Sequence, residues 1–183
     1  MILVTQATDL PPVPRPTGPV PPFGDVAEQC LDTVFRFLVH VVGDRHLADD
    51  LTADTFERAL RAWNAYDPDR GTPAMWLVGI ARRIALDHFR SEKRRRERET
   101  RWASTEPTSS DPPSGPGGIS PQLRAALSGL TPPERELVAL RVILGFSTNE
   151  AAAIVGSTPS AVSTQLHRSM NRLRKEVASN AAA

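Results

Sequence analysis

The sequence predicts an all-α protein made of two small helical domains joined by a flexible linker. Three observations lead to this prediction. Apolar residues recur every three or four positions in each segment that could build a core. No segment alternates apolar and polar residues as a half-buried strand does. A stretch rich in Pro, Ser and Gly, residues 103–120, separates two segments of helical pattern.

Composition divides the 183 residues into five parts. Residues 1–24 hold seven prolines and almost no charge, which predicts a disordered tail. The first domain is expected at residues 25–102 and the linker at residues 103–120. The second domain then occupies residues 121–178, and residues 179–183 form a short tail.

Several function classes are disfavoured by the composition. The single cysteine, Cys30, cannot form an intramolecular disulfide, and no His or Cys spacing suits a metal. There is neither a glycine-rich phosphate loop nor a nucleophile-base arrangement, so we expect no cofactor and no enzymatic activity. No apolar run approaches the roughly 20 residues of a membrane span, and no export signal opens the chain. We therefore expect a cytoplasmic protein without a membrane partner.

The first domain is predicted to contain three helices. The first covers residues 26–42 and ends at Gly43, a residue suited to the left-handed backbone that closes helices. The second covers about residues 46–66. The third helix is expected to begin at Pro73, with Thr72 as its cap, and to run to about Arg98. Proline is tolerated at the first helical position, because a backbone N–H there would have no partner within the helix. The core face of this third helix is expected to hold Trp76, Ile80 and Ile84.

The second domain has clear helix start signals. The segments Thr131–Glu134 and Ser147–Glu150 both fit the capping box, in which hydroxyl and carboxylate each bond a backbone N–H. Helices should therefore begin near Pro132 and Thr148, and another should begin at Pro159.

A helix-turn-helix pattern lies at residues 147–175. A short helix with three successive alanines is followed by Gly156 and then by a longer helix, and small residues let two helices cross closely. In this motif the second helix enters the major groove of DNA. An ordinary helical hairpin with a solvated polar face has the same spacing. The candidate DNA-contacting side chains are Ser160, Ser163, Thr164, His167, Arg168 and Arg172.

Charge is unevenly distributed over the first domain. Residues 25–66 carry eight acids and four bases, whereas residues 67–102 carry six acids and ten bases. The basic tract could neutralise phosphates, although interleaved acids also fit a solvated, salt-bridged helix. Nearby aromatic rings could stack on unpaired bases, and Tyr66 beside the turn is expected to be the exposed one.

The second helix carries an acidic stripe opposite its apolar arc. Asp50, Asp54, Glu57 and Arg61 recur at i, i+4, i+7 and i+11, so they share one face. A positively charged protein surface would complement this stripe, and a plain solvated helix face fits the pattern as well.

Taken together, these segments resemble the bacterial RNA polymerase sigma factors of the extracytoplasmic function (ECF) type, which contain only regions two and four. In the first domain, residues 48–56 (ADDLTADTF) and residues 76–90 are similar to the family's polymerase-binding and minus-ten motifs. In the second, residues 130–136, 145–156 and 166–168 follow the pattern of region four.

The resemblance implies a mechanism, partners and site residues. The partners would be promoter DNA and core RNA polymerase, through the clamp helices of its largest subunit and the flap of its second-largest subunit. An anti-sigma factor is a further partner that the family allows.

The resemblance also implies which residues contact these partners. The helix-turn-helix candidates would read the minus-thirty-five element. Polymerase contacts would come from Asp49, Asp50, Leu51, Thr52, Asp54, Thr55 and Phe56. Minus-ten contacts would come from Tyr66, Arg70, Arg82, Arg83, His88, Arg90, Lys93 and Arg94.

Two rival interpretations account for less of the sequence. A stand-alone LuxR-like helix-turn-helix regulator would explain residues 131–175 but not the first domain. An enzyme has little support from the pattern of residues. A regulator should bind duplex promoter DNA by itself in a mobility-shift assay, whereas a sigma factor should bind it only poorly without polymerase.

Overall fold

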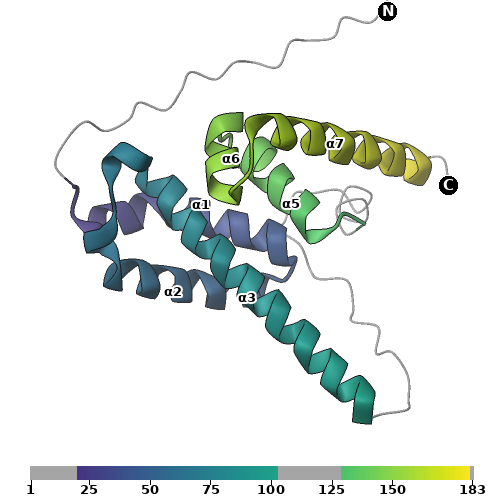
Figure 1. Cartoon of the computed structure of the whole chain (residues 1–183), viewed down its shortest axis with the longest axis horizontal. Helices are drawn as coiled ribbons and strands as arrows, with labels where there is room; N and C mark the ends of the chain where they lie inside the picture. Colours follow the sequence, from purple (N-terminus) through teal and green to yellow (C-terminus); the bar gives the residue numbers. More distant parts are fainter. Residues whose placement is uncertain (1–19, 103–128, 182–183) are drawn as a thin grey trace, which may run out of the picture.

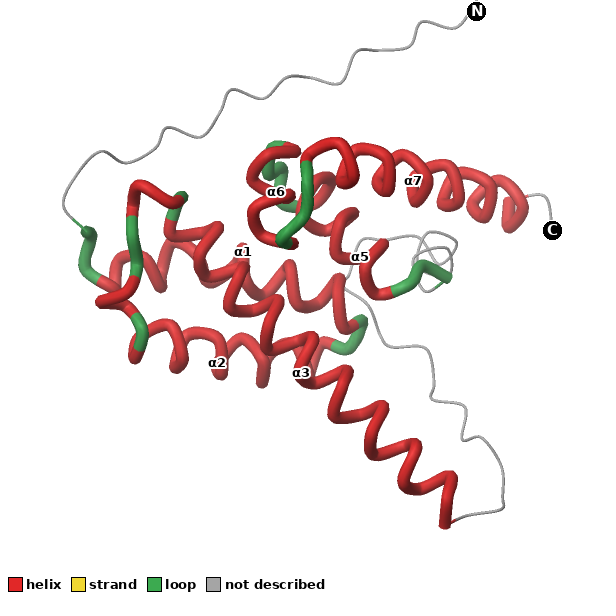
Figure 2. The backbone as a smooth tube through the Cα atoms, viewed as in Figure 1, coloured by secondary structure: helices red, strands yellow, loops and turns green. Residues whose placement is uncertain are grey.

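The computed structural model describes residues 20–102 and 129–181, and the regular elements in these two ranges are all helical (Figures 1 and 2). The all-α prediction is confirmed for this part of the chain. The α-helices are α1 (Phe23–Val42), α2 (Arg45–Arg61), α3 (Pro73–Trp102), α5 (Pro132–Val138), α6 (Thr148–Val155) and α7 (Pro159–Ala181). Two 3₁₀ turns, Trp63–Ala65 and Pro68–Arg70, lie between α2 and α3, and a π-helical turn, Ala139–Ile143, follows α5.

Helices α1, α2 and α3 pack on one another and form the first unit. Gly43 closes α1 with φ of 77°, in the left-handed region where glycine is favoured. Asp44 then caps α2, because its carboxylate accepts the backbone N–H groups of His46 and Leu47 at 2.8 and 3.2 Å. The sharp reversal between α1 and α2 thus follows from two adjacent residues.

The first helix starts earlier than the sequence predicted. Phe23 and Gly24 belong to α1 rather than to a disordered tail at residues 1–24, while residues 1–19 lie outside the described part. The Phe23 ring lies 5.3 Å from Trp63 and 6.4 Å from Phe56, measured between ring centroids. These apolar contacts hold the start of α1 against the end of α2.

The other helix ends also differ from the predicted ones. Helix α2 stops at Arg61, and a 3₁₀ turn replaces the predicted helix up to Tyr66. Helix α3 continues to Trp102, beyond the predicted end near Arg98. At the C-terminus, α7 extends to Ala181, so most of the predicted tail at residues 179–183 is helical.

The core face of α3 is rotated from the predicted one. Leu77, Val78 and Ala81 are fully buried and Ile84 nearly so, whereas Trp76 and Ile80 are only partly buried. Two neighbouring helices, α1 and α2, pack on α3, and this broadens its buried arc.

Helices α5, α6 and α7 form a second unit that packs on the first. The turn Ala139–Ile143 and α5 lie against α1, and α6 lies against α3 (Figure 1). One continuous apolar cluster includes Phe37 and Leu77 of the first unit and Leu140 and Phe146 of the second. The predicted linker at residues 103–120 lies outside the described residues, so its flexibility stays a prediction.

The described residues contain neither a helix suited to a membrane nor a cluster of metal-binding side chains. No helix there combines the length and apolar character that crossing a membrane requires. No group of three or more His, Cys, Asp or Glu side chains within residues 20–102 and 129–181 could hold a metal ion.

Candidate nucleic-acid and protein interfaces

The acidic stripe of α2 faces solvent. Asp49, Asp50 and Asp54 are exposed, and neither Asp50 nor Asp54 has an ion-pair partner among the described residues. Glu57 and Arg61, further along the same stripe, pair with each other. The free carboxylates therefore gather toward the first half of α2, where they can meet a cationic partner.

Three predicted polymerase contacts are buried instead of exposed. Leu51 is 6% exposed and packs in the core, as does Thr55, which is fully buried. The hydroxyls of Thr52 and Thr55 donate to the carbonyls of Ala48 and Leu51, at 2.6 and 2.7 Å. Leu51 and Thr55 can support a contact surface by shaping α2, but their side chains do not reach it.

An open groove of about 600 Å³ runs between α1 and α2 beside the acidic stripe. Its apolar wall includes Leu31, 53% exposed, together with Phe35 and Phe56. Arg45 lies over the ring of Phe35, 5.0 Å from its centroid. Asp49 lines the same groove, so an apolar surface adjoins an acidic one.

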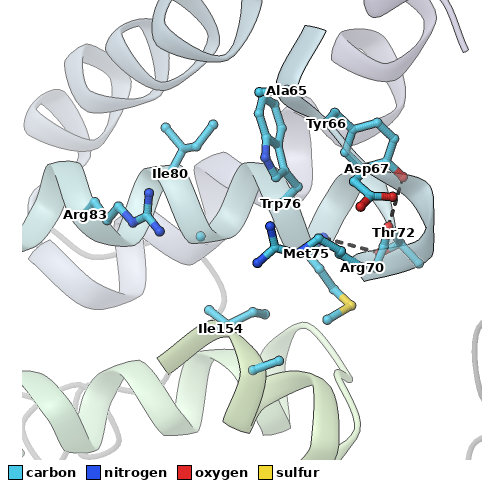
Figure 3. A pocket seen from close by; sticks show the side chains of 13 residues that line it. Ala65, Tyr66, Asp67, Arg70, Thr72, Met75, Trp76, Ile80, Arg83 and Ile154 are labelled. Carbon is cyan, nitrogen blue, oxygen red and sulfur yellow. Dashed lines mark hydrogen bonds between the residues drawn. The ribbon is translucent and has the colours of Figure 1, made fainter. Parts of the chain in front are cut away.

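A second hollow, a cleft of about 330 Å³, lies at the start of α3 (Figure 3). It brings together three of the predicted minus-ten residues, Tyr66, Arg70 and Arg83. Arg70 comes from the turn before α3 and Arg83 from the helix itself, and both are exposed. The two guanidinium groups can bind the phosphates of a nucleic-acid strand. The half-buried indole of Trp76 beside them can stack on a base.

Tyr66 is not the exposed ring that the sequence predicted. It is 5% exposed and stacks on Trp63, with centroids 4.8 Å apart and planes 4° from parallel. Its hydroxyl donates to the carbonyl of Gly71 at 2.9 Å. Burial, followed by the charge of Asp67, raises the pKa of Tyr66. Tyr66 therefore fixes the turn that holds the cleft, and Trp76 presents more of its ring.

Three further residues line the cleft: Asp67 and Thr72 from the turn and Met75 from the first residues of α3. Thr72 was expected as a cap, and its hydroxyl does accept the N–H of Met75 at 3.3 Å. Ile154 of α6 also lines the cleft, and no sequence pattern indicated that contact.

The remaining minus-ten candidates are divided between two environments. Arg82 is turned away from the cleft and forms an ion pair with Glu136 of α5. The others, His88, Arg90, Lys93 and Arg94, lie further along α3 and do not line the cleft. Arg90 and Lys93 pair with acids on their own helix, at 3.3 and 3.8 Å.

The second unit contains the predicted helix-turn-helix. Ser147 caps α6 as expected: its hydroxyl accepts the N–H of Glu150 at 3.2 Å, and the Glu150 carboxylate accepts the N–H of Ser147 at 2.7 Å. Gly156 turns the chain with φ of 70°. Ala151 and Ala152 are buried together with Val162, so small side chains allow α6 and α7 to cross closely.

Helix α7 offers a polar surface along residues 160–172. Asn171 and His167 hydrogen-bond at 2.9 Å, and Arg172 lies 3.5 Å from Glu134 of α5. Backbone and hydroxyl bonds from Thr131, with the charge of Arg172 adding to them, lower the pKa of Glu134. All six predicted recognition residues are exposed: Ser160, Ser163, Thr164, His167, Arg168 and Arg172.

The cap at Ser147 gives a stability prediction. Ser147→Ala removes the acceptor for the Glu150 N–H and should lower the free energy of unfolding by about 1 kcal/mol. Ser157→Ala, at an exposed turn residue, is the matched control and should change it by less than about 0.5 kcal/mol. Urea unfolding followed by circular dichroism measures both variants. Equal stabilities would show that the cap contributes nothing.

Family comparisons match both units. The family model described as Sigma-70 region 2 matches residues 26–95, and the one described as Sigma-70, region 4 matches residues 120–173.

Curated relatives and solved structures agree with these matches. ECF RNA polymerase sigma factor BldN of Streptomyces coelicolor is 34% identical over 86% of this chain, which spans 61% of that protein. RNA polymerase sigma factor CarQ of Myxococcus xanthus is 32% identical over 84% of this chain and 87% of its own length. The sigma factor RpoE of Bartonella quintana, solved with the anti-sigma factor NepR, superposes with a TM-score of 0.66 at 25% identity, covering 85% of this chain and 96% of RpoE.

Proposed function

The chain belongs to the ECF sigma factors. On that premise we propose that it binds core RNA polymerase, recognises two promoter elements and separates the DNA strands at the minus-ten element. The acidic stripe of α2 and the groove beside it would meet the clamp helices of the polymerase's largest subunit. The second unit would meet the flap of the second-largest subunit. A chain that works with the polymerase would act in the cytoplasm, as a non-catalytic specificity subunit.

One observation supports this division of labour above the others. The cationic, aromatic cleft at the start of α3, which α6 also lines, and the acidic stripe of α2 are separate surfaces of the molecule. DNA would be repelled by the stripe and attracted by the cleft, so the two surfaces suit different partners. The exposed face of α7 offers a third surface, shaped for duplex DNA.

Strand opening needs no chemical fuel in this arrangement. Unstacking a base costs a few kcal/mol, and a cleft that stacks and hydrogen-bonds a displaced base returns a similar amount. Trp76 supplies a partly exposed aromatic face, while Arg70 and Arg83 can neutralise the adjacent phosphates. Single-stranded DNA would thus be favoured in the cleft over duplex DNA.

The LuxR-like alternative is not favoured. It explains the second unit alone, whereas the region 2 family model covers residues 26–95 of the first unit. The whole-chain relatives are also sigma factors.

An anti-sigma factor is a reasonable regulatory partner. RpoE of Bartonella quintana, a structural relative, was solved in complex with the anti-sigma factor NepR. The apolar groove of Leu31, Phe35 and Phe56 would suit the apolar face of a helix from such a protein.

Transcription from a randomised promoter library tests the proposed function. Core polymerase and the purified chain are mixed with templates whose upstream 50 or so base pairs are random, and transcribed templates are sequenced. We expect two separate enriched sequence blocks, since the helix that reads duplex DNA and the cleft that holds an opened strand act at different sites. No enrichment over core polymerase alone would refute the function, and one block bound without polymerase would favour the regulator.

The same library tests the recognition helix. Arg168→Ala should relax the base preference at one position of the upstream block by about 1–3 kcal/mol and leave the downstream block unchanged. Arg174→Ala is the matched control, because Arg174 is exposed on the same helix but bonded to Asn171. An altered downstream block, or equal effects of both variants, would contradict this assignment.

A further inference from the structure

Five aromatic rings form a continuous row between the groove beside α2 and the cleft at the start of α3. Phe56 lines the groove, and the ring of Phe23 lies 6.4 Å from it, measured between centroids. Phe23 is followed by Trp63 at 5.3 Å, and Trp63 is followed by Trp76 at 5.5 Å. Tyr66 completes the row, because it lies 4.8 Å from Trp63 and 5.8 Å from Trp76. A displacement of any one ring therefore disturbs its neighbours.

Trp63 occupies the centre of this row. Its ring contacts Phe23, Tyr66 and Trp76. Tyr66 and Trp76 both line the cleft (Figure 3). The hydroxyl of Tyr66 donates to the carbonyl of Gly71, another lining residue. The position of Trp63 therefore affects the aromatic face of the cleft and, through Tyr66, the backbone of the turn before α3.

Residues 21–23, at the start of α1 and directly before it, hold Trp63 in two ways. The indole N–H of Trp63 donates to the carbonyl of Pro21 over 3.3 Å. The ring of Phe23 meets the indole edge to face, with 64° between the two planes. Pro22 lies between them with φ of −57° and ψ of 137°, and two successive proline rings restrict the backbone here. The indole is thus supported by a carbonyl and a ring that a stiff backbone presents.

We propose that residues 21–23 are positioning residues for strand capture, which hold Trp63, and through Trp63 the ring of Trp76, in the orientation that stacks on an unpaired base. This inference rests on the proposed function of the cleft. The region 2 family model matches from residue 26 onward, so residues 21–23 precede the matched part. A segment that composition assigned to a tail would therefore contribute to DNA binding.

A fixed ring matters because ordering a side chain during binding costs free energy. An indole that can adopt several orientations stacks on a base less favourably than one that is already in place. Phosphate binding should change less, because Arg83 belongs to α3 and has no ring in the row. Loss of the Phe23 ring should therefore reduce mainly the contribution of the captured base to affinity.

A scan with abasic oligonucleotides tests the inference on the full chain in complex with core polymerase. The probes are fluorescently labelled single strands of the downstream block from the promoter library, one for each strand of the duplex. In each further probe one nucleotide lacks its base but keeps its sugar and phosphate. Fluorescence anisotropy gives the affinity for every probe.

The expected result is a ratio of two affinities. For the unmodified chain, removal of the captured base should weaken binding about tenfold. For Phe23→Ala the same removal should weaken binding about twofold or less, because Trp76 is no longer held in place. Trp63→Phe removes the N–H that Pro21 accepts and should lower the ratio to about threefold.

The ratio separates positioning from a general loss of stability. A variant that only destabilises the fold weakens the binding of complete and abasic strands equally and leaves their ratio unchanged. Ser147→Ala, which removes a cap far from the row, is the control for this effect. Phe23→Tyr keeps the ring and should keep the ratio of the unmodified chain. Phe23→Leu keeps apolar volume without the ring and should lose most of the ratio, so it replaces Phe23→Ala if circular dichroism shows that variant to be unfolded.

Every other outcome counts against the inference. An unchanged ratio in folded Phe23→Ala or Phe23→Leu would overturn it, because Trp76 would then need no support from residues 21–23. An equal loss in Phe23→Tyr would overturn it as well, because the ring would not be the supporting group. If no abasic position weakens binding to the unmodified chain, the cleft captures no base. The proposed function of the cleft then fails, and the inference fails with it.

Discussion

Reversing two charges on α2, Asp50→Lys with Asp54→Lys, is expected to weaken binding of core RNA polymerase about a hundredfold or more. Both side chains are exposed and lie one helical turn apart, so the variant should fold normally. Under the proposed function the acidic stripe would become a basic one and would face a basic surface of the polymerase. Binding is measured by the fluorescence anisotropy of labelled chain titrated with core polymerase.

A matched control separates local from overall charge. Asp25→Lys with Glu28→Lys changes the net charge by the same amount at exposed residues of α1. This variant should bind within about threefold of the unmodified chain, since single rim charges contribute little. If both variants lose affinity equally, the stripe has no special role. If neither does, the docking surface lies elsewhere.

The second large effect is expected at the cleft. Arg70→Glu with Arg83→Glu should lower run-off transcription from a duplex promoter about a hundredfold, with core binding unchanged. The two guanidinium groups line the cleft, and carboxylates in their place would repel the entering phosphate chain. Both residues are exposed, so little packing is lost.

Two comparisons make this prediction specific to strand opening. A template with a mismatched, already open minus-ten segment should restore much of the activity, because the cost of unpairing has been removed. Arg70→Lys with Arg83→Lys keeps both charges and should retain most activity on duplex DNA. Equal losses of transcription on open and duplex templates would show that these residues do not act in strand opening.

Helix positions were largely predictable because they depend on local chemistry. Ser147 and Glu150 cap α6 within four residues of sequence, and Gly43 and Gly156 end helices through their own backbone freedom. The early start of α1 was not predictable in this way. Phe23 joins the helix through contacts with Phe56 and Trp63, which lie more than thirty residues away.

The candidate sites were predictable in composition but not in orientation. The family resemblance assigned Leu51 and Thr55 to the polymerase contact, but both side chains lie in the buried core, which a match of motifs does not show. Likewise Tyr66 was expected outside because it adjoins a turn, and stacking on Trp63 places it inside. The partner of Arg82 lies 54 residues away on another unit, beyond the reach of any local pattern.

We propose that this chain lets core polymerase separate promoter strands, and permanganate footprinting measures that step directly. Permanganate oxidises unpaired thymines, so a promoter obtained from the library is treated with core polymerase, with the chain, or with both. We expect reactive thymines in the downstream block only when both proteins are present. A promoter that stays unreactive with both proteins, or that reacts equally with core polymerase alone, would contradict the account.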